Sequence, residues 1–251
     1  MAIQTVFKRY ELKYMLTPEQ KARILYAAAP YIQLDKYGKT TIRNIYFDTD
    51  NYRLIRRSME KPIYKEKLRI RSYERVRENS STVFVELKKK YDGVVYKRRL
   101  PLPYSDAMEW LLGASSFPLN TQISREIDYF INFYEPLFPT MFLSYEREAY
   151  YDKSCKDFRI TFDDQILSRR EDLHLSSDVY GTPILPDGKI LMELKCSSGI
   201  PLWMTDILSS ERIYKTSFSK YGTAYSNLIF PKNYKQQKEI MTYGSNLQRH
   251  F

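Results

Sequence analysis

The chain has 251 residues, of which 43% are hydrophobic and 15% aromatic, so it carries enough apolar side chains for a folded core. Its 40 Lys and Arg residues against 30 Asp and Glu give a formal charge of +10, which predicts an anionic partner: nucleic acid, anionic lipid or a polyphosphate. The chain has two histidines, which excludes a histidine-rich metal site and argues against a Ser-His-Asp triad.

The start of the chain and its cysteines predict a cytoplasmic location. Residues 1–6 form neither the basic region nor the apolar region of a secretory signal peptide. No apolar run approaches the roughly 18 to 20 residues that span a bilayer. Cys155 and Cys196 are too few for a disulfide scaffold, and both are interpreted as small buried thiols in a reducing compartment.

Helix signals lie between strand signals along the chain. Thr17 as N-cap, Pro18 in the first turn and Gln20 able to reach back to the cap predict a helix that continues to about Ala29. Later apolar stripes predict three further helices, at 105–112, 124–134 and 202–208.

Strands are predicted at 41–48 and 141–151, and Asp92-Gly93 is typical of a hairpin turn. Residues 169–186 are polar and punctuated by Gly and Pro, which indicates a loop. The chain shows no internal repeat and no linker, so residues 1–230 are predicted to form a single domain. Residues 231–251 are interpreted as a tail, either helical or disordered.

Six short segments carry charged residues at alternate positions. In a strand, residues two apart point to the same face, so each segment gathers its charges on one side and its apolar residues on the other. The charged face carries more Lys and Arg than Asp and Glu. These segments are 9–13, 67–71, 84–88, 97–99, 159–163 and 192–195.

On a single strand, such a pattern indicates an ordinary solvent-exposed face. Here it recurs near both ends of the chain, and the pattern Glu-x-Lys occurs at 11–13, 86–88 and 193–195. This recurrence favours an α+β fold in which a closed antiparallel β-barrel encloses a polar, basic lumen and the helices pack outside.

A lumen lined by Lys and Arg repels itself unless an anion fills it. A phosphoanhydride chain fits, because guanidinium groups bind phosphate oxygens in pairs and ammonium groups add point charge. The few carboxylates in the same wall are candidate ligands for a divalent metal, which prefers oxygen atoms and bridges phosphates.

These segments resemble, in order, the motifs of the triphosphate tunnel metalloenzyme superfamily, and within it the polyphosphate polymerase (VTC-type) domain. The resemblance extends over roughly residues 7 to 222. The matching stretches are Arg9-Tyr-Glu-Leu-Lys-Tyr, Ile45-Tyr-Phe-Asp48, Leu68-Arg-Ile-Arg71, Phe84-Val-Glu-Leu-Lys88, Lys97-Arg-Arg-Leu, Arg147 in Tyr-Glu-Arg, Arg159-Ile-Thr-Phe-Asp, Met192-Glu-Leu-Lys195 and Phe218-Ser-Lys-Tyr221.

The resemblance implies a phosphate-binding tunnel with bound Mn²⁺ or Mg²⁺. It implies three sets of site residues: Arg69, Arg71, Arg147 and Lys88 as catalytic residues; Lys13, Lys97, Arg159, Lys195, Lys220, Glu11 and Glu86 as substrate-binding residues; and Glu193 as metal ligand.

The implied reaction is transfer of the ATP γ-phosphoryl group to a growing inorganic polyphosphate chain. The expected partners are ATP and polyphosphate, with a separate membrane protein as a further candidate and no specific nucleic acid. Hydrolytic relatives begin with Glu-x-Glu-x-Lys, whereas this chain has Arg9 at the first position, which favours the polymerase branch. Two alternatives stay open: a triphosphatase or inorganic polyphosphatase of the same fold, and a non-catalytic module that binds polyphosphate or nucleic acid.

Overall fold

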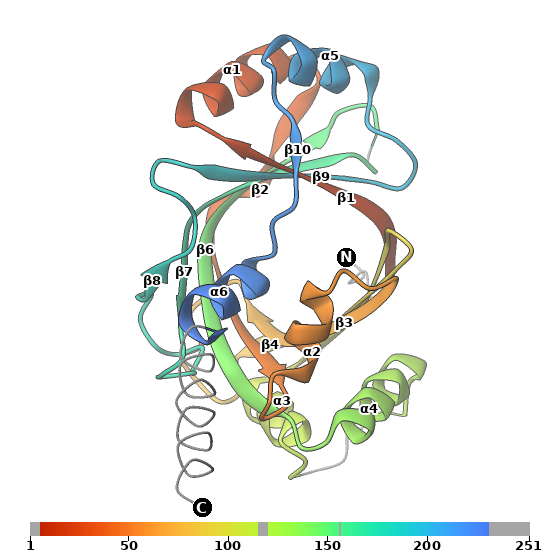
Figure 1. Ribbon diagram of the computed structural model, residues 1–251, viewed down its shortest axis with the longest axis vertical. Coiled ribbons are helices and arrows are strands. Elements are labelled where there is room, and N and C mark those ends of the chain that lie inside the picture. Colours follow the sequence, from red (N-terminus) through yellow and green to blue (C-terminus); the bar gives the residue numbers. More distant parts are fainter. Residues whose placement is uncertain (1–5, 115–119, 156, 231–251) are drawn as a thin grey trace, which may run out of the picture.

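The computed structural model describes residues 6–114, 120–155 and 157–230 (Figure 1). The strands are β1 (Val6–Leu16), β2 (Ile32–Asp48), β3 (Tyr64–Ser72), β4 (Thr82–Tyr91), β5 (Val94–Pro103), β6 (Phe138–Asp152), β7 (Arg159–Arg169), β8 (Thr182–Pro183), β9 (Ile190–Cys196) and β10 (Lys215–Thr216). The helices are α1 (Pro18–Ala28), α2 (Arg53–Met59), α3 (Tyr104–Leu111), α4 (Gln122–Tyr134), α5 (Leu202–Ser210) and α6 (Lys220–Leu228).

The strands form one antiparallel sheet in the order β10-β1-β5-β4-β3-β2-β6-β7-β8. Strand β9 lies off this path and pairs with both β1 and β7, so it bridges two strands near opposite ends of the sheet. The predicted antiparallel α+β fold is confirmed. The strand order does not show a simple closed barrel, because the sheet ends at the two-residue strands β10 and β8. Strand β1 also pairs with two strands along its length: Val6–Arg9 pair with β5, and Tyr10–Leu16 pair with β9.

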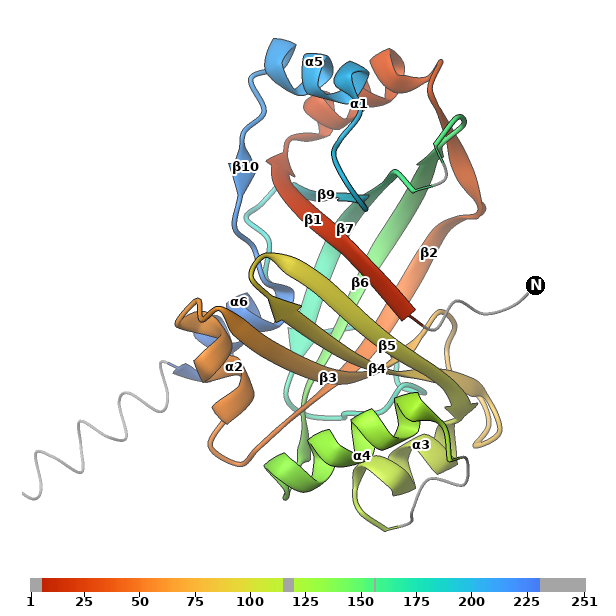
Figure 2. The ribbon, with the colours of Figure 1, turned by 90° about the vertical axis from the view of Figure 1, so that its right-hand side faces the viewer.

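The outer, apolar face of the curved sheet is covered by helices at its two ends (Figure 2). Helices α3 and α4 cover one core, which contains Leu68, Ile70 and Leu87. Helices α1 and α5 cover a second core at the opposite end, which contains Ile160 and Leu194. These apolar residues alternate with the charged ones in sequence, so burying them turns the charged side chains to the inside of the curved sheet.

The helices predicted from caps and apolar stripes are present, with small differences at their ends. Thr17 and Gln20 form the expected capping box at the start of α1. Helix α4 begins slightly earlier than predicted, because Thr121 caps it. Within the described part of the chain, no helix has the length and apolar character needed to cross a membrane.

Several elements differ from the sequence-based expectation. Helices α2 and α6 were not predicted, and both are short. The N-cap of α2, Tyr52, makes no side-chain bond, whereas Ser219 caps α6 by accepting from the Gly222 N–H. The loop predicted at 169–186 contains the short strand β8. Cys196 is buried as predicted, but Cys155 is exposed, because it lies in the turn after β6. The predicted tail at 231–251 falls outside the described residues.

Candidate functional site: a basic cavity

The inward face of the sheet surrounds a cavity of about 800 Å³. The predicted site residues reach it from seven strands and from the first turn of α6. Those that line it are Glu11, Lys13, Arg69, Arg71, Lys88, Lys97, Arg147, Arg159, Glu193, Lys195 and Lys220. Sequence alternation and family motifs therefore identified a set of side chains that the fold brings together.

Glu86 is the one predicted site residue that lies behind the cavity lining. Its side chain is fully buried, and both of its oxygens are engaged. Arg69 donates from Nε and Nη2 at 2.9 and 2.7 Å, and Arg99 donates from Nε at 2.7 Å. Lys97 Nζ lies 3.3 Å away and Arg71 Nε 3.9 Å away. The Glu86 carboxylate therefore does not face the cavity. It pairs with the arginines and the lysine that do.

Burial alone would raise the pKa of Glu86. The four cations around it outweigh burial and hold the pKa well below its usual value. Glu86 is therefore ionised in the folded protein, and its charge supports Arg69 and Arg71 in the cavity wall. Arg71 is further fixed by bonds to Asn44 Oδ1 at 2.9 Å and to the Tyr145 hydroxyl at 2.8 Å.

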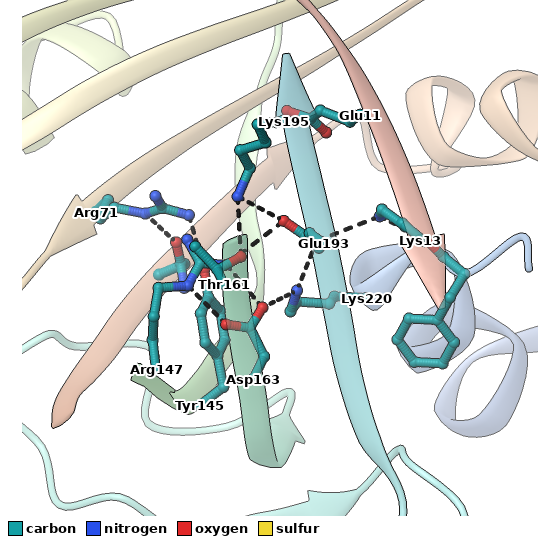
Figure 3. Close-up of polar contacts among 12 residues, drawn as sticks. Glu11, Lys13, Arg71, Tyr145, Arg147, Thr161, Asp163, Glu193, Lys195 and Lys220 are labelled. Atoms are coloured by element: carbon teal, nitrogen blue, oxygen red, sulfur yellow. Dashed lines mark hydrogen bonds and ion pairs between the residues drawn. The ribbon is translucent and has the colours of Figure 1, made fainter. Parts of the chain in front are cut away.

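A second cluster of charges comes from side chains of β6, β7, β9 and α6 (Figure 3). Arg147 donates two bonds to Asp163, from Nε at 2.6 Å and from Nη2 at 2.7 Å. Lys220 Nζ lies 2.6 Å from Asp163 and 3.1 Å from Glu193, so it joins the two carboxylates. Lys195 approaches Glu193 at 2.9 Å and also donates to the Thr161 hydroxyl.

Glu193 is surrounded by cations. Besides Lys195 and Lys220, Lys13 lies 3.5 Å and Arg147 3.6 Å from its carboxylate. Burial would raise the pKa of Glu193, but Lys220, Lys195, Lys13 and Arg147 lower it well below the usual value. Glu193 is thus an ionised carboxylate at the centre of a cationic wall.

Two further ion pairs involve predicted site residues. Glu11 accepts a bond from Lys88 at 2.6 Å, and Asp35 accepts one from Arg159 at 2.7 Å. These pairs lie on different strands, so each one ties two parts of the cavity wall together.

The carboxylates of the cavity do not form a metal cage by themselves. Among the described residues, no group of three or more His, Cys, Asp or Glu side chains is placed to hold a metal ion. Glu193, the predicted ligand, and Glu11 are the predicted carboxylates that reach the lining, and cations surround Glu193. This donor set fits a divalent ion only when phosphate oxygens supply most of the ligands, as in a metal–nucleotide complex that enters as substrate.

Lys97 provides a pH prediction for the unliganded protein. Burial lowers its pKa to about 6, although Glu86 opposes this shift, whereas an unfolded lysine has a pKa of about 10.4. Above pH 6 the unfolded chain therefore binds a proton that the folded one lacks, and the free energy of unfolding rises with pH by at most about 1.4 kcal/mol per unit for this group. Urea titrations from pH 6 to 8 should show that the free energy of unfolding rises with pH, and that it rises less steeply in Lys97→Gln. Equal slopes for the wild type and Lys97→Gln would contradict the prediction.

Several functional candidates were missed by sequence reasoning. Lys67, Arg99 and Asp163 lie within the alternating segments, on the same faces as predicted residues, so the signal was present but was not used. Tyr46 and Tyr145 hydroxyls accept bonds from Arg69 and Arg71, a role that depends on pairing between distant strands.

The motifs at Asp48 and Tyr221 meet in the fold and hold α6 against the sheet. Asp48 is fully buried and accepts bonds from the backbone N–H groups of Thr49, Leu54 and Ile55, which caps α2. The Tyr221 hydroxyl donates to the same carboxylate at 3.0 Å, and the Tyr221 ring stacks on Tyr46. Since Lys220 precedes Tyr221, this anchor places Lys220 in the cavity.

Tyr221→Phe should therefore lower the free energy of unfolding by about 1–3 kcal/mol, because it removes a donor from a buried carboxylate. Chemical denaturation measures this loss. Tyr225→Phe is the matched control, as Tyr225 is buried on the same helix and packs through its ring against Tyr52. Equal stability of Tyr221→Phe and the wild type would show that the Asp48–Tyr221 contact does not anchor α6.

In fold, the chain is similar to a putative adenylate cyclase from Bacillus halodurans, with a TM-score of 0.54, 18% identity, and 86% of this chain and 96% of that chain covered. A more distant similarity is to the Mimivirus capping enzyme triphosphatase, with a TM-score of 0.35, 10% identity and coverage of 82% and 86%. No curated protein matches the chain. The model of the VTC domain matches residues 8–229, and the chain therefore belongs to the VTC domain family, as its ordered motifs predicted.

Proposed function

We propose that this chain is a polyphosphate polymerase, which transfers the γ-phosphoryl group of ATP to the end of a linear polyphosphate and releases ADP. The observation that carries the proposal is a cavity of about 800 Å³ whose wall presents Arg and Lys from several strands around few carboxylates. Such a wall suits a narrow chain that carries many negative charges. Membership of the VTC domain family supports a substrate that contains linked phosphates.

The chemical step needs positioning and charge stabilisation more than proton transfer. A terminal oxygen of the polyphosphate forms a bond to the γ-phosphorus of ATP, the bond from that phosphorus to the bridging oxygen breaks, and the electron pair leaves on the β-phosphate of ADP. The attacking oxygen is already anionic near neutral pH, so no general base is required. Arg69, Arg71 and Arg147 would bind the triphosphate, and Lys88 and Lys220 would bind the polymer.

A divalent ion enters this proposal as part of the metal–nucleotide substrate, where it would neutralise phosphate charge. Glu193 is the residue that would contact it. Lys13, Lys97, Arg159 and Lys195 would bind further phosphates.

Hydrolysis of triphosphate or polyphosphate is the rival activity, and the carboxylates disfavour it. Attack by water is helped by a base whose pKa is near the working pH. The surrounding cations hold the pKa values of Glu193 and Asp163 below their usual range, despite burial, so both are weak bases. An anionic phosphate acceptor does not need such a base.

Incubation of the purified protein with ATP and Mn²⁺ distinguishes the alternatives. A ladder of polyphosphate chains with ADP supports the polymerase, free phosphate alone identifies a hydrolase, and the absence of turnover identifies a binding module. Arg71→Ala and Lys88→Ala should each slow turnover by about ten- to a hundred-fold, because each removes charge-assisted bonds.

Two neighbouring residues provide matched controls for those variants. Arg98 points outward and pairs with Glu126 of α4 at 2.9 Å, and Lys89 lies 3.9 Å from Glu66 on the opposite face from Lys88. Arg98→Ala and Lys89→Ala should leave turnover near the wild-type value. If Arg71→Ala and Lys88→Ala also do so, the site assignment is wrong.

A further inference from the structure

Tyr145 contacts cations from both charge clusters of the cavity wall. It lies on β6 two residues before Arg147, so the strand directs both side chains to its inner face. The Tyr145 hydroxyl accepts a bond from Arg71 Nη2 at 2.8 Å. The Tyr145 ring lies 5.0 Å from the Arg147 guanidinium and 4.7 Å from Lys220 Nζ (Figure 3). One side chain thus touches cations that come from β3, β6 and α6.

The hydroxyl contact fixes the orientation of the Arg71 guanidinium. Arg71 Nε donates to Asn44 Oδ1 at 2.9 Å, and Arg71 Nη2 donates to the Tyr145 hydroxyl. Because a guanidinium is planar, two bonds from different nitrogens define both its plane and its rotation in that plane. The direction in which Arg71 presents its remaining donors to a phosphate therefore depends on the Tyr145 hydroxyl.

The ring contacts act on two cations that share one carboxylate. Arg147 donates two bonds to Asp163, and Lys220 Nζ lies 2.6 Å from the same side chain. The face of an aromatic ring is electrostatically negative, and its attraction for a cation increases where water is excluded. Asp163 and the Tyr145 ring together restrict where Arg147 and Lys220 can lie.

The Tyr145 side chain is almost fully enclosed. It is 2% exposed, so a ligand in the cavity would meet the cations around the ring far more than the ring itself. This burial favours an action through the neighbouring cations over a direct contact with the reacting atoms.

We propose that Tyr145 is a positioning residue that couples the two charge clusters: its hydroxyl orients Arg71, and its ring orients Arg147 and Lys220. This inference rests on the proposed function and adds to it a side chain that sets the geometry of three cations in the site. Tyr145 itself makes and breaks no bond in the reaction.

A double-variant cycle tests the role of the hydroxyl. Tyr145→Phe keeps the ring and should slow ATP turnover by about three- to thirtyfold, because Arg71 loses one of its two fixed bonds. If the hydroxyl acts through Arg71, the double variant Tyr145→Phe/Arg71→Ala should turn over ATP within about twofold of Arg71→Ala alone. A loss caused by general destabilisation would instead multiply the loss of Arg71→Ala.

Two further variants test the ring and provide a control. Tyr145→Leu removes the ring as well as the hydroxyl, and should slow turnover by about another threefold or more relative to Tyr145→Phe. Tyr225→Phe should match the wild type, since Tyr225 is buried on α6 and its ring packs against Tyr52. Thermal denaturation shows whether each variant is folded, and if Tyr145→Leu is not, the cycle with Tyr145→Phe decides alone.

Tripolyphosphate affinity, measured by isothermal titration, gives the same cycle without catalysis. If Tyr145→Phe weakens tripolyphosphate binding by the same factor in the wild-type and Arg71→Ala backgrounds, the hydroxyl does not act through Arg71 and the inference is wrong. It is also wrong if Tyr145→Phe equals the wild type in both turnover and affinity. Wild-type protein that binds tripolyphosphate but makes no polymer would contradict the polymerase, and the affinity cycle would still decide the role of Tyr145.

Discussion

Glu86→Gln should destabilise the unliganded protein by about 3–5 kcal/mol, the usual cost of removing one partner from a buried ion pair. Glutamine keeps the shape of the side chain but not its charge. Arg69, Arg71, Lys97 and Arg99 would then share a buried site without the carboxylate that neutralises them. Urea denaturation followed by tryptophan fluorescence measures the change.

Tripolyphosphate should restore much of the stability that Glu86→Gln loses, because a bound polyanion supplies the missing negative charge. The matched control is Glu126→Gln, which breaks the partly exposed pair with Arg98 and should cost about 0–1 kcal/mol. A loss for Glu86→Gln no larger than for this control would show that the Glu86 cluster does not stabilise the cavity wall.

Arg147→Ala should reduce ATP turnover by about a hundred- to ten-thousand-fold. Arg147 makes two charge-assisted bonds to Asp163, and its guanidinium lies 3.6 Å from the Glu193 carboxylate. These contacts fix the orientation of the guanidinium beside the proposed site of phosphoryl transfer. Two such bonds to phosphate are worth about 3–6 kcal/mol together, and each 1.36 kcal/mol corresponds to about tenfold in rate. Release of ADP measures the effect.

Arg147→Lys distinguishes charge from geometry. It retains the positive charge but loses the planar fork, so turnover should stay at least about tenfold below the wild type. Asp163 keeps Lys220 at 2.6 Å in both variants, which limits the loss of stability. Arg98→Ala is the control. If Arg147→Ala turns over ATP within threefold of the wild-type rate at matched thermal stability, Arg147 is not a catalytic residue.

The strand faces were predictable from sequence because they depend on a local rule. Arg98 and Arg99 are neighbours, and alternation alone sends one to each face: Arg99 lies in the cavity wall and Arg98 on the outer surface against α4. The same rule separates Lys88 from Lys89. Helix α1 was also predictable, because its capping box lies within a few residues of sequence.

The roles of the carboxylates were not predictable in this way. Glu86 was assigned to substrate binding, but it lies behind the lining because four cations from the two neighbouring strands, β3 and β5, converge on it. Alternation placed Asp163 on the inner face, but its role depends on Arg147 and Lys220, which come from β6 and α6. Helix α2 escaped prediction because its N-cap, Tyr52, makes no side-chain bond. Asp48, at the end of the preceding strand, accepts bonds from the first turn instead, and Tyr221 donates to the same carboxylate.

The sequence by itself therefore determined which side chains share a face and which family the chain belongs to, because both depend on residue order and short periodicity. The tertiary structure decided how the sheet curves, that β9 bridges β1 and β7, and which charges neutralise one another. Those features depend on contacts between residues far apart in the chain, whose pairing no local pattern encodes.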